Sequence, residues 1–271
     1  MIGANAWAEN SLGTVSFADE LFKKTEYKLS VAEYLRIIHY NPDADKDSSI
    51  SLRLAIAYAA AGEKDRAVSM LDGVIGASKS PDVKQSASLN LVRLYYSQKR
   101  FKLALDEGNE LFAAHPKETI ASQLHPFIVW SYIKSNRWDD AALFEEKIGA
   151  ADSLVMNLRE GKNIPKKSPA IAGVMSAVLP GSGHVYAGKW RDGIMSLIIN
   201  GVFGYCMYDS FKNGNQSVGW LLTVVEIGWY TGNIYTGAGS ARRANNQRVE
   251  EYHDKLIKTG VEQPNEIFEL P

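Results

Sequence analysis

The sequence has little cysteine and no excess of charge of either sign. Its one cysteine, Cys206, excludes an internal disulfide framework, a CxxC redox pair and a multi-cysteine zinc site. The 30 Lys and Arg residues balance 31 Asp and Glu residues, giving a formal net charge of −1. This balance argues against a nucleic-acid-binding protein with a wholly basic surface, so we expect no nucleic-acid partner.

The usual motifs of catalysis and metal binding are also missing. The five histidines show no ligand spacing, and the sequence contains neither an HExxH helix nor a GxSxG nucleophile elbow. Residues 183–189 match the GxxxxGK pattern of a phosphate-binding loop, but Trp190 stands where that loop needs Ser or Thr. We therefore expect no catalytic residue, no metal, no cofactor and no enzyme activity.

The first residues carry only part of an export signal. Ala4-Asn5-Ala6 and Ala6-Trp7-Ala8 fit the small-x-small pattern of a signal-peptide cleavage site, whereas the charged start and apolar run that should precede it are missing. We interpret residues 1–16 as a possible signal-peptide remnant and a disordered start. An ordinary alanine-rich start is the alternative.

The sequence does contain an internal repeat with a period of 37 residues. Three columns recur at this step, with helical spacing inside each copy. They are Leu21, Tyr58, Tyr95 and Tyr132; then Tyr27, Lys64, Phe101 and Trp138; then Ser30, Ala67, Ala104 and Ala141. Each copy predicts a helical hairpin that is too small to bury its own apolar face, so stacked copies would share one core.

These columns resemble tetratricopeptide repeats. The matching features are the tyrosine of the first helix, the turn, the aromatic residue, the small residue and a closing Pro42 or Pro116. The resemblance covers four repeats over residues 17–157, departs at Leu21 and Ser30 in the first copy, and implies a concave surface that binds a protein partner. Because the period exceeds the family's usual length of about 34 residues, we expect longer loops between repeats. An irregular helical bundle is the alternative.

A polar linker at residues 158–169 precedes a hydrophobic module at residues 170–240. Its three uncharged runs are 170–187, 193–208 and 218–235, the last containing one acid. Runs two and three approach the length that crosses a bilayer, so we expect a transmembrane helical hairpin, with a buried helix pair as the alternative. Pro and Gly interrupt run one, which either spans or is re-entrant.

The module carries a motif of its own. It resembles a small bacterial membrane module of unknown function, with a PGxGxxYxG-type motif, that accompanies exported tetratricopeptide-repeat proteins. His184 stands where that module usually has an amide. The candidate site residues are Pro180, Gly181, Gly183, Tyr186, Gly188, Glu226, Gly228 and Gly232.

Two features of the third uncharged run suggest contacts between helices. Gly228 and Gly232 form a GxxxG pair, which permits close helix packing. Glu226 is an acid in an apolar run, and such residues are functional candidates. We expect Asn200 and Tyr205 to bond a protonated Glu226 as a structural contact, with a proton or ion pathway as the alternative.

Together these patterns predict an all-α chain: a helical-hairpin solenoid, a transmembrane helical hairpin module, and a polar helical tail at residues 241–271. We predict a membrane-anchored scaffold or adaptor that contacts the lipid bilayer and a protein partner. The alternatives are a subunit of a membrane transporter or enzyme complex that uses Glu226 and the Pro180–Gly188 turn, or a soluble regulator. The exported resemblance and the basic residues predict a bacterial inner-membrane protein with periplasmic repeats, although two spans alone would place the repeats in the cytoplasm.

Overall fold

The computed structural model describes residues 15–116 and 118–271. Within these ranges the chain is helical and contains no strand, which confirms the all-α prediction. The described residues divide into two compact units, one formed by residues 15–116, 118–159 and 260–271 and the other by residues 160–259. The predicted signal-peptide remnant lies, up to residue 14, outside the described residues.

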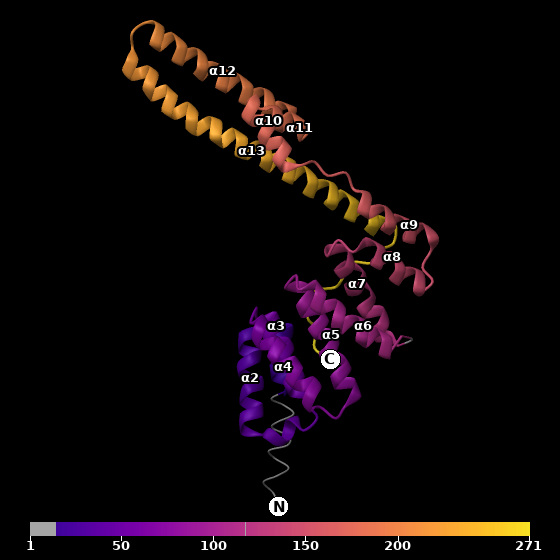
Figure 1. The fold of residues 1–271 in the computed structure, drawn as a ribbon. Coiled ribbons are helices and arrows are strands. Elements are labelled where there is room, and N and C mark those ends of the chain that lie inside the picture. The colour runs from indigo at the N-terminus through magenta and orange to yellow at the C-terminus, as the bar shows by residue number, and fades with distance from the viewer. Residues whose placement is uncertain (1–14, 117) are drawn as a thin grey trace, which may run out of the picture. The chain divides into compact units, whose positions relative to one another are not determined.

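The first unit is a stack of helical hairpins (Figure 1). Residues 15–23 are helical and contact the next helix, where the Ser30 hydroxyl donates to the Ala18 carbonyl at 2.9 Å. The elements are α2 (Tyr27–Tyr40), η1 (Pro42–Asp45), α3 (Ser49–Ala60), α4 (Lys64–Ala77), α5 (Pro81–Ser97), α6 (Phe101–Ala114), α7 (Thr119–Lys134), α8 (Trp138–Lys147) and α9 (Asp152–Glu160). Each helix from α2 to α7 packs on the one that follows it, and α5 also lies against both α3 and α7.

The hairpins repeat with the 37-residue step of the sequence. The second helix of each hairpin begins at the predicted column, Tyr27, Lys64, Phe101 and Trp138. The small residues that follow are buried, with at most 1% of their surface exposed: Ser30, Ala67, Ala104 and Ala141. The backbone turns through the left-handed region at the same step, with φ of 63°, 86°, 60° and 60° at Thr25, Gly62, Lys99 and Asn136. Each helix pair is therefore joined by the same turn geometry.

The extra residues of the period do not all enter the loops. A long connection, residues 41–48 with η1, separates α2 from α3, as expected. The later connections, residues 78–80 and 115–118, are short, because α5 and α7 are themselves 17 and 16 residues long against 12 for α3. The prediction of longer loops is thus wrong for these two connections. The helix start at Pro81 explains one case, since proline at the first helical position suits the helix and Ser80 caps it by accepting from the Val83 amide.

The second unit is built on one long helix. Its elements are η2 (Gly161–Asn163), α10 (Pro169–Val178), α11 (Ser182–Tyr186), α12 (Trp190–Lys212) and α13 (Gln216–Lys258). Helices α10, α11 and α12 all pack on α13, which runs unbroken for 43 residues. The first uncharged run is therefore two short helices, α10 and α11. The predicted helical tail ends at Lys258, after which Gly260 adopts φ of 109° and the chain has no regular structure.

The transmembrane hairpin predicted for residues 193–208 and 218–235 of the hydrophobic module is not supported. Among the helices of the described residues, none combines the length and the apolarity that a bilayer crossing requires. Polar residues interrupt the two longest helices: Asp192, Asn200 and Asp209 in α12, and Glu226 and Asn233 in α13. These residues, together with many glycines, lower the mean hydropathy of each helical stretch that is long enough to cross a bilayer.

Candidate functional site

Two glycines of the PGxGxxYxG-type motif allow close packing around α11. Gly181, which follows Pro180 between α10 and α11, has φ of 87°, and a β-carbon on it would overlap the backbone oxygen of Gly193. A β-carbon on Gly183 would overlap the backbone oxygen of Ala172 in α10. Only glycine fits either position without a backbone shift. The structure therefore explains both glycines by packing inside the second unit.

The tyrosine of the motif, Tyr186, forms hydrogen bonds with the two residues that precede α10. The Tyr186 hydroxyl accepts from the Ser168 amide at 3.2 Å, and the Lys167 ammonium donates to the Tyr186 carbonyl. Asn245 of α13 bonds the Lys167 backbone in both directions, at 2.8 Å each. Gly188, with φ of 89°, ends α11. These residues join α11, α13 and the segment before α10, which is a folding role.

The predicted contacts of Glu226 and the GxxxG pair are not formed. No heavy atom lies within 4 Å of a β-carbon placed on Gly228 or Gly232, apart from their own helix and chain neighbours, so this pair faces open space. The side chain of Tyr205 is 69% exposed, and the amide nitrogen of Asn200 donates to the Ser196 carbonyl at 2.6 Å. The Oε2 atom of Glu226 is buried without a hydrogen-bond partner. The sequence pattern does not fix how α12 and α13 rotate about their axes, and the rotation decides these contacts.

The hairpin of α12 and α13 has its polarity reversed. Asn200 and Asn233 are buried with side-chain atoms that lack hydrogen-bond partners. Large apolar side chains instead cover the outside of both helices, including Ile194, Met195, Ile198, Val202, Leu221, Val224, Ile227 and Trp229. Proteins rarely expose contiguous apolar patches in water unless the patch binds something. We call these exposed side chains, with Trp190 and Trp220, the apolar hairpin surface.

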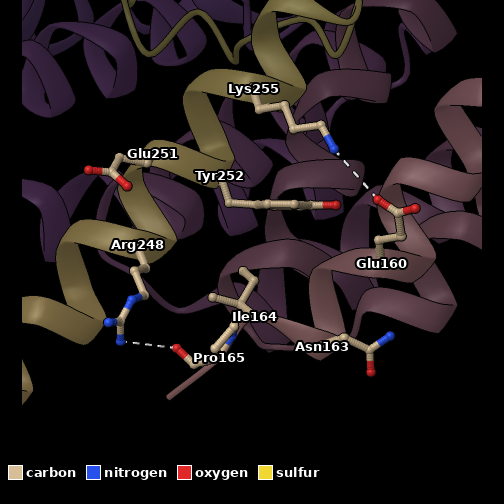
Figure 2. A pocket seen from close by; sticks show the side chains of 8 residues that line it. All are labelled: Glu160, Asn163, Ile164, Pro165, Arg248, Glu251, Tyr252 and Lys255. Carbon is tan, nitrogen blue, oxygen red and sulfur yellow. Dashed lines mark hydrogen bonds and ion pairs between the residues drawn. The ribbon is translucent and has the colours of Figure 1, made fainter. Parts of the chain in front are cut away.

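A cleft of about 460 Å³ lies elsewhere in the second unit (Figure 2). Glu160 and Lys255 form an ion pair at 3.5 Å across it, and Arg248 donates to the Pro165 carbonyl at 3.3 Å. Tyr252 lies between these groups in Figure 2, and burial, followed by the charge of Glu160, raises the pKa of its hydroxyl. The Gln247 amide donates to Glu251 at 2.9 Å. Because each charged group of the cleft already has a partner within the protein, the cleft does not favour a ligand of either charge.

The chain's last residues lie along the first helices of the hairpins. After Gly260, Val261 is 2% exposed, and the Trp130 indole in α7 donates to the Glu262 carbonyl at 2.8 Å. At the other end, the Arg53 guanidinium in α3 donates to the Pro271 carbonyl at 2.8 Å. Figure 1 shows this yellow segment passing α7 and ending beside α5. We call residues 261–271 the tail, and we call Arg53, Arg93, Tyr96 and Trp130 with their surroundings on α3, α5 and α7 the tail-binding face.

The tail alternates its side chains as an extended peptide does. Phe268 and Leu270 pack against the hydrophobic core of the repeat unit, while Ile267 is 66% exposed and Glu269 is exposed. A period of two is the signature of extended backbone. The tail is therefore seated by two apolar side chains two residues apart, with backbone hydrogen bonds near both ends.

Charge on the tail complements charge on α5. Burial lowers the pKa of the Arg93 guanidinium, and nearby Glu269 opposes that effect. The Nε atom of Arg93 is buried without a hydrogen-bond partner. Burial and then the charge of Glu266 raise the pKa of Tyr96. The charge of Glu269 therefore favours the charged form of Arg93, and that of Glu266 favours the neutral form of Tyr96.

Arg53 is itself held in place by a second contact. Its other guanidinium nitrogen lies 3.0 Å from a carboxylate oxygen of Asp19, and the Tyr34 hydroxyl donates to the same carboxylate. This network orients the guanidinium toward the end of the tail. A carbonyl or a carboxylate of any extended segment in this position would meet a positioned donor.

No pattern in the sequence predicts the tail-binding face. The tail belongs to a segment for which we predict a polar helix, although Gly260 and Pro264 are signals that a helix ends here. Its partners lie up to 218 residues away in the chain, as with Arg53 and Pro271, and no local pattern identifies such contacts.

No family model matches the chain, and no curated protein matches its sequence.

Proposed function

We propose that the protein is an adaptor with two separate contact surfaces. Its tetratricopeptide-like unit binds a protein partner, and its apolar hairpin surface attaches it to lipid. The observation that carries the proposal is the polarity of the α12–α13 pair, in which Asn200 and Asn233 are buried while many large apolar side chains face outward.

Lipid is the environment that fits this polarity. Outward apolar side chains lie on several sides of both helices. A helix pair embedded at the boundary of headgroups and acyl chains can bury more than one of these sides at once. Trp190 and Trp220, 57% and 62% exposed, lie near opposite ends of the antiparallel pair, where interfacial aromatic residues are favoured. Attachment needs no helix that crosses the bilayer, since apolar faces also bind within the interface.

Vesicle flotation tests the attachment. The full chain is mixed with phosphatidylcholine vesicles, and we expect it to rise with them through a density gradient. Charges at exposed apolar positions, in the variant Ile198→Glu with Val224→Glu, should leave the protein at the bottom. The control, Asn246→Glu with Gln247→Glu, adds the same charge at exposed polar positions of α13 and should float.

Two outcomes contradict the attachment: a wild-type chain that stays at the bottom, or an Ile198→Glu, Val224→Glu variant that floats as well as the control. The helical content of each variant, from circular dichroism, shows whether the change acts through folding. Sidedness stays a prediction, and a phosphatase fusion at Lys162 in the native gene tests whether the repeats are exported.

The partner-binding surface is tested by chemical cross-linking of the full chain on the native membranes to which we propose it attaches. We expect cross-linked peptides of a second protein to map to residues 15–159. Cross-links confined to residues 160–259 would contradict a binding role for the repeats.

A further inference from the structure

The tail lies on the repeat unit as a bound extended peptide would, although it belongs to the same chain. It has no regular secondary structure, it is connected through Gly260, and it contacts α3, α5 and α7 by side chains and backbone. These helices are the first helices of three successive hairpins. The face they share is thus continuous along the stack.

We propose that the tail-binding face is a peptide-binding site, and that the tail occupies it until an extended segment of a protein partner displaces it. The inference rests on the proposed partner-binding role of the repeats. It adds the location of the site, the chemistry of the partner and an internal competitor.

The tail specifies what the partner segment must carry. Two apolar side chains two residues apart replace Phe268 and Leu270 against the core. A carboxylate near them suits Arg93, whose Nε atom is buried without a hydrogen-bond partner and whose charge Glu269 of the tail favours. A backbone carbonyl receives the indole N–H of Trp130, and a carbonyl or carboxylate receives Arg53. An acidic, extended segment with an apolar-x-apolar core meets all of these requirements.

Occupation by the tail regulates access to the face. A tethered segment competes at an effective concentration set by its link to the chain, which is of the order of millimolar for short flexible links. A partner segment binds only if it displaces the tethered tail. Substitutions that weaken the binding of the tail should therefore raise the apparent affinity of the face for a peptide added in solution.

The test is a titration of the full chain with a fluorescent synthetic peptide of residues 261–271, followed by anisotropy. The variant Phe268→Ala with Leu270→Ala weakens the seated side chains of the chain's own tail. We expect this variant to bind the peptide about tenfold or more tightly than the wild type. The control Ile267→Ala changes an exposed apolar side chain of the same tail and should bind as the wild type does.

Two further variants identify the site of binding. In the Phe268→Ala, Leu270→Ala background, Trp130→Phe keeps an aromatic side chain of smaller size and removes the N–H donor, and Arg53→Gln removes the cation. Each should weaken peptide binding severalfold. A peptide with alanine in place of its phenylalanine and leucine should not bind.

Three results overturn the proposal. The first is equal peptide binding by the wild type and the Phe268→Ala, Leu270→Ala variant while both keep their helical content. The second is binding unaffected by Trp130→Phe and Arg53→Gln. The third is unfolding of both the tail variant and a chain that stops at Gly260, because a tail required for folding is not an exchangeable ligand.

Failure here is distinguishable from failure of the proposed function. The flotation and cross-linking results do not depend on the peptide. Cross-links on residues 15–159 together with absent peptide binding would keep the repeats as a partner-binding unit and reject this face as its site.

Discussion

His184 shows how one residue of the motif can make the fold sensitive to pH. It is 5% exposed in α11, and its Nδ1 atom is buried without a hydrogen-bond partner. Burial lowers the pKa of the imidazole from its ordinary value of 6.5; the charge of Asp192 opposes this shift and that of Arg243 adds to it. The folded state therefore favours the neutral ring.

We predict that this residue destabilises the second unit in mild acid. Below pH 6.5 the His184 imidazole binds a proton in the unfolded chain but stays neutral in the folded chain. The free energy of unfolding therefore falls as the pH decreases from 6.5 toward the lowered pKa of the folded state. For one group the slope is at most about 1.4 kcal/mol per pH unit. His184→Gln should reduce this slope in urea unfolding measured between pH 7.5 and 5.

The control for this prediction is His39→Gln, which changes an exposed histidine in α2 of the other unit. It should leave the acid sensitivity of the second unit unchanged. An unaltered slope in His184→Gln would mean that another group causes the sensitivity.

At the scale of elements, the glycines of the second unit differ in what surrounds them. Gly183 meets the backbone of α10, and Gly228 on α13 meets open space. The sequence presents both as motif glycines with equal weight. Only the structure shows that the first is required by packing and that the second is available to an outside contact.

We predict opposite effects of alanine at these two positions. Gly183→Ala forces α10 away from α11 and should lower the free energy of unfolding of the second unit by about 1–3 kcal/mol. Gly228→Ala adds a good helix former at an open position and should raise it by about 0.5–1 kcal/mol. Urea unfolding followed by circular dichroism measures both. Equal effects of the two substitutions would contradict the packing around α11.

How far sequence predicts an element depends on how local its cause is. The starts of α2, α4, α6 and α8 followed from the 37-residue columns, because a small residue and a turn recur within each hairpin. The lengths of α5 and α7 did not: both helices end in the 37-residue register, at Ser97 and Lys134, but they begin earlier in the repeat than α3 does. The rotation of α12 against α13, and with it the environment of Glu226, also depends on contacts that no single helix encodes.

At the scale of the whole molecule, the chain leaves the repeat unit and comes back to it. Residues 160–259 form their own compact unit, and the tail rejoins the first unit through Val261, Phe268 and Leu270. The core under α3 and α5 is thus completed by the far end of the chain. The consequence is that a change in the tail acts on the first unit, although in sequence it adjoins the second.

We predict that Leu270→Ala loosens the repeat unit alone. Removing a partly buried leucine side chain should lower the free energy of unfolding of that unit by about 1–2 kcal/mol. Hydrogen exchange followed by mass spectrometry should show faster amide exchange in α3, α5 and α7 and unchanged exchange in α10–α13. Ile267→Ala, at a 66% exposed position, is the matched control and should change neither unit. Gly183→Ala gives the converse, with faster exchange in α10–α13 only. Faster exchange in both units after Leu270→Ala would show instead that they unfold as one.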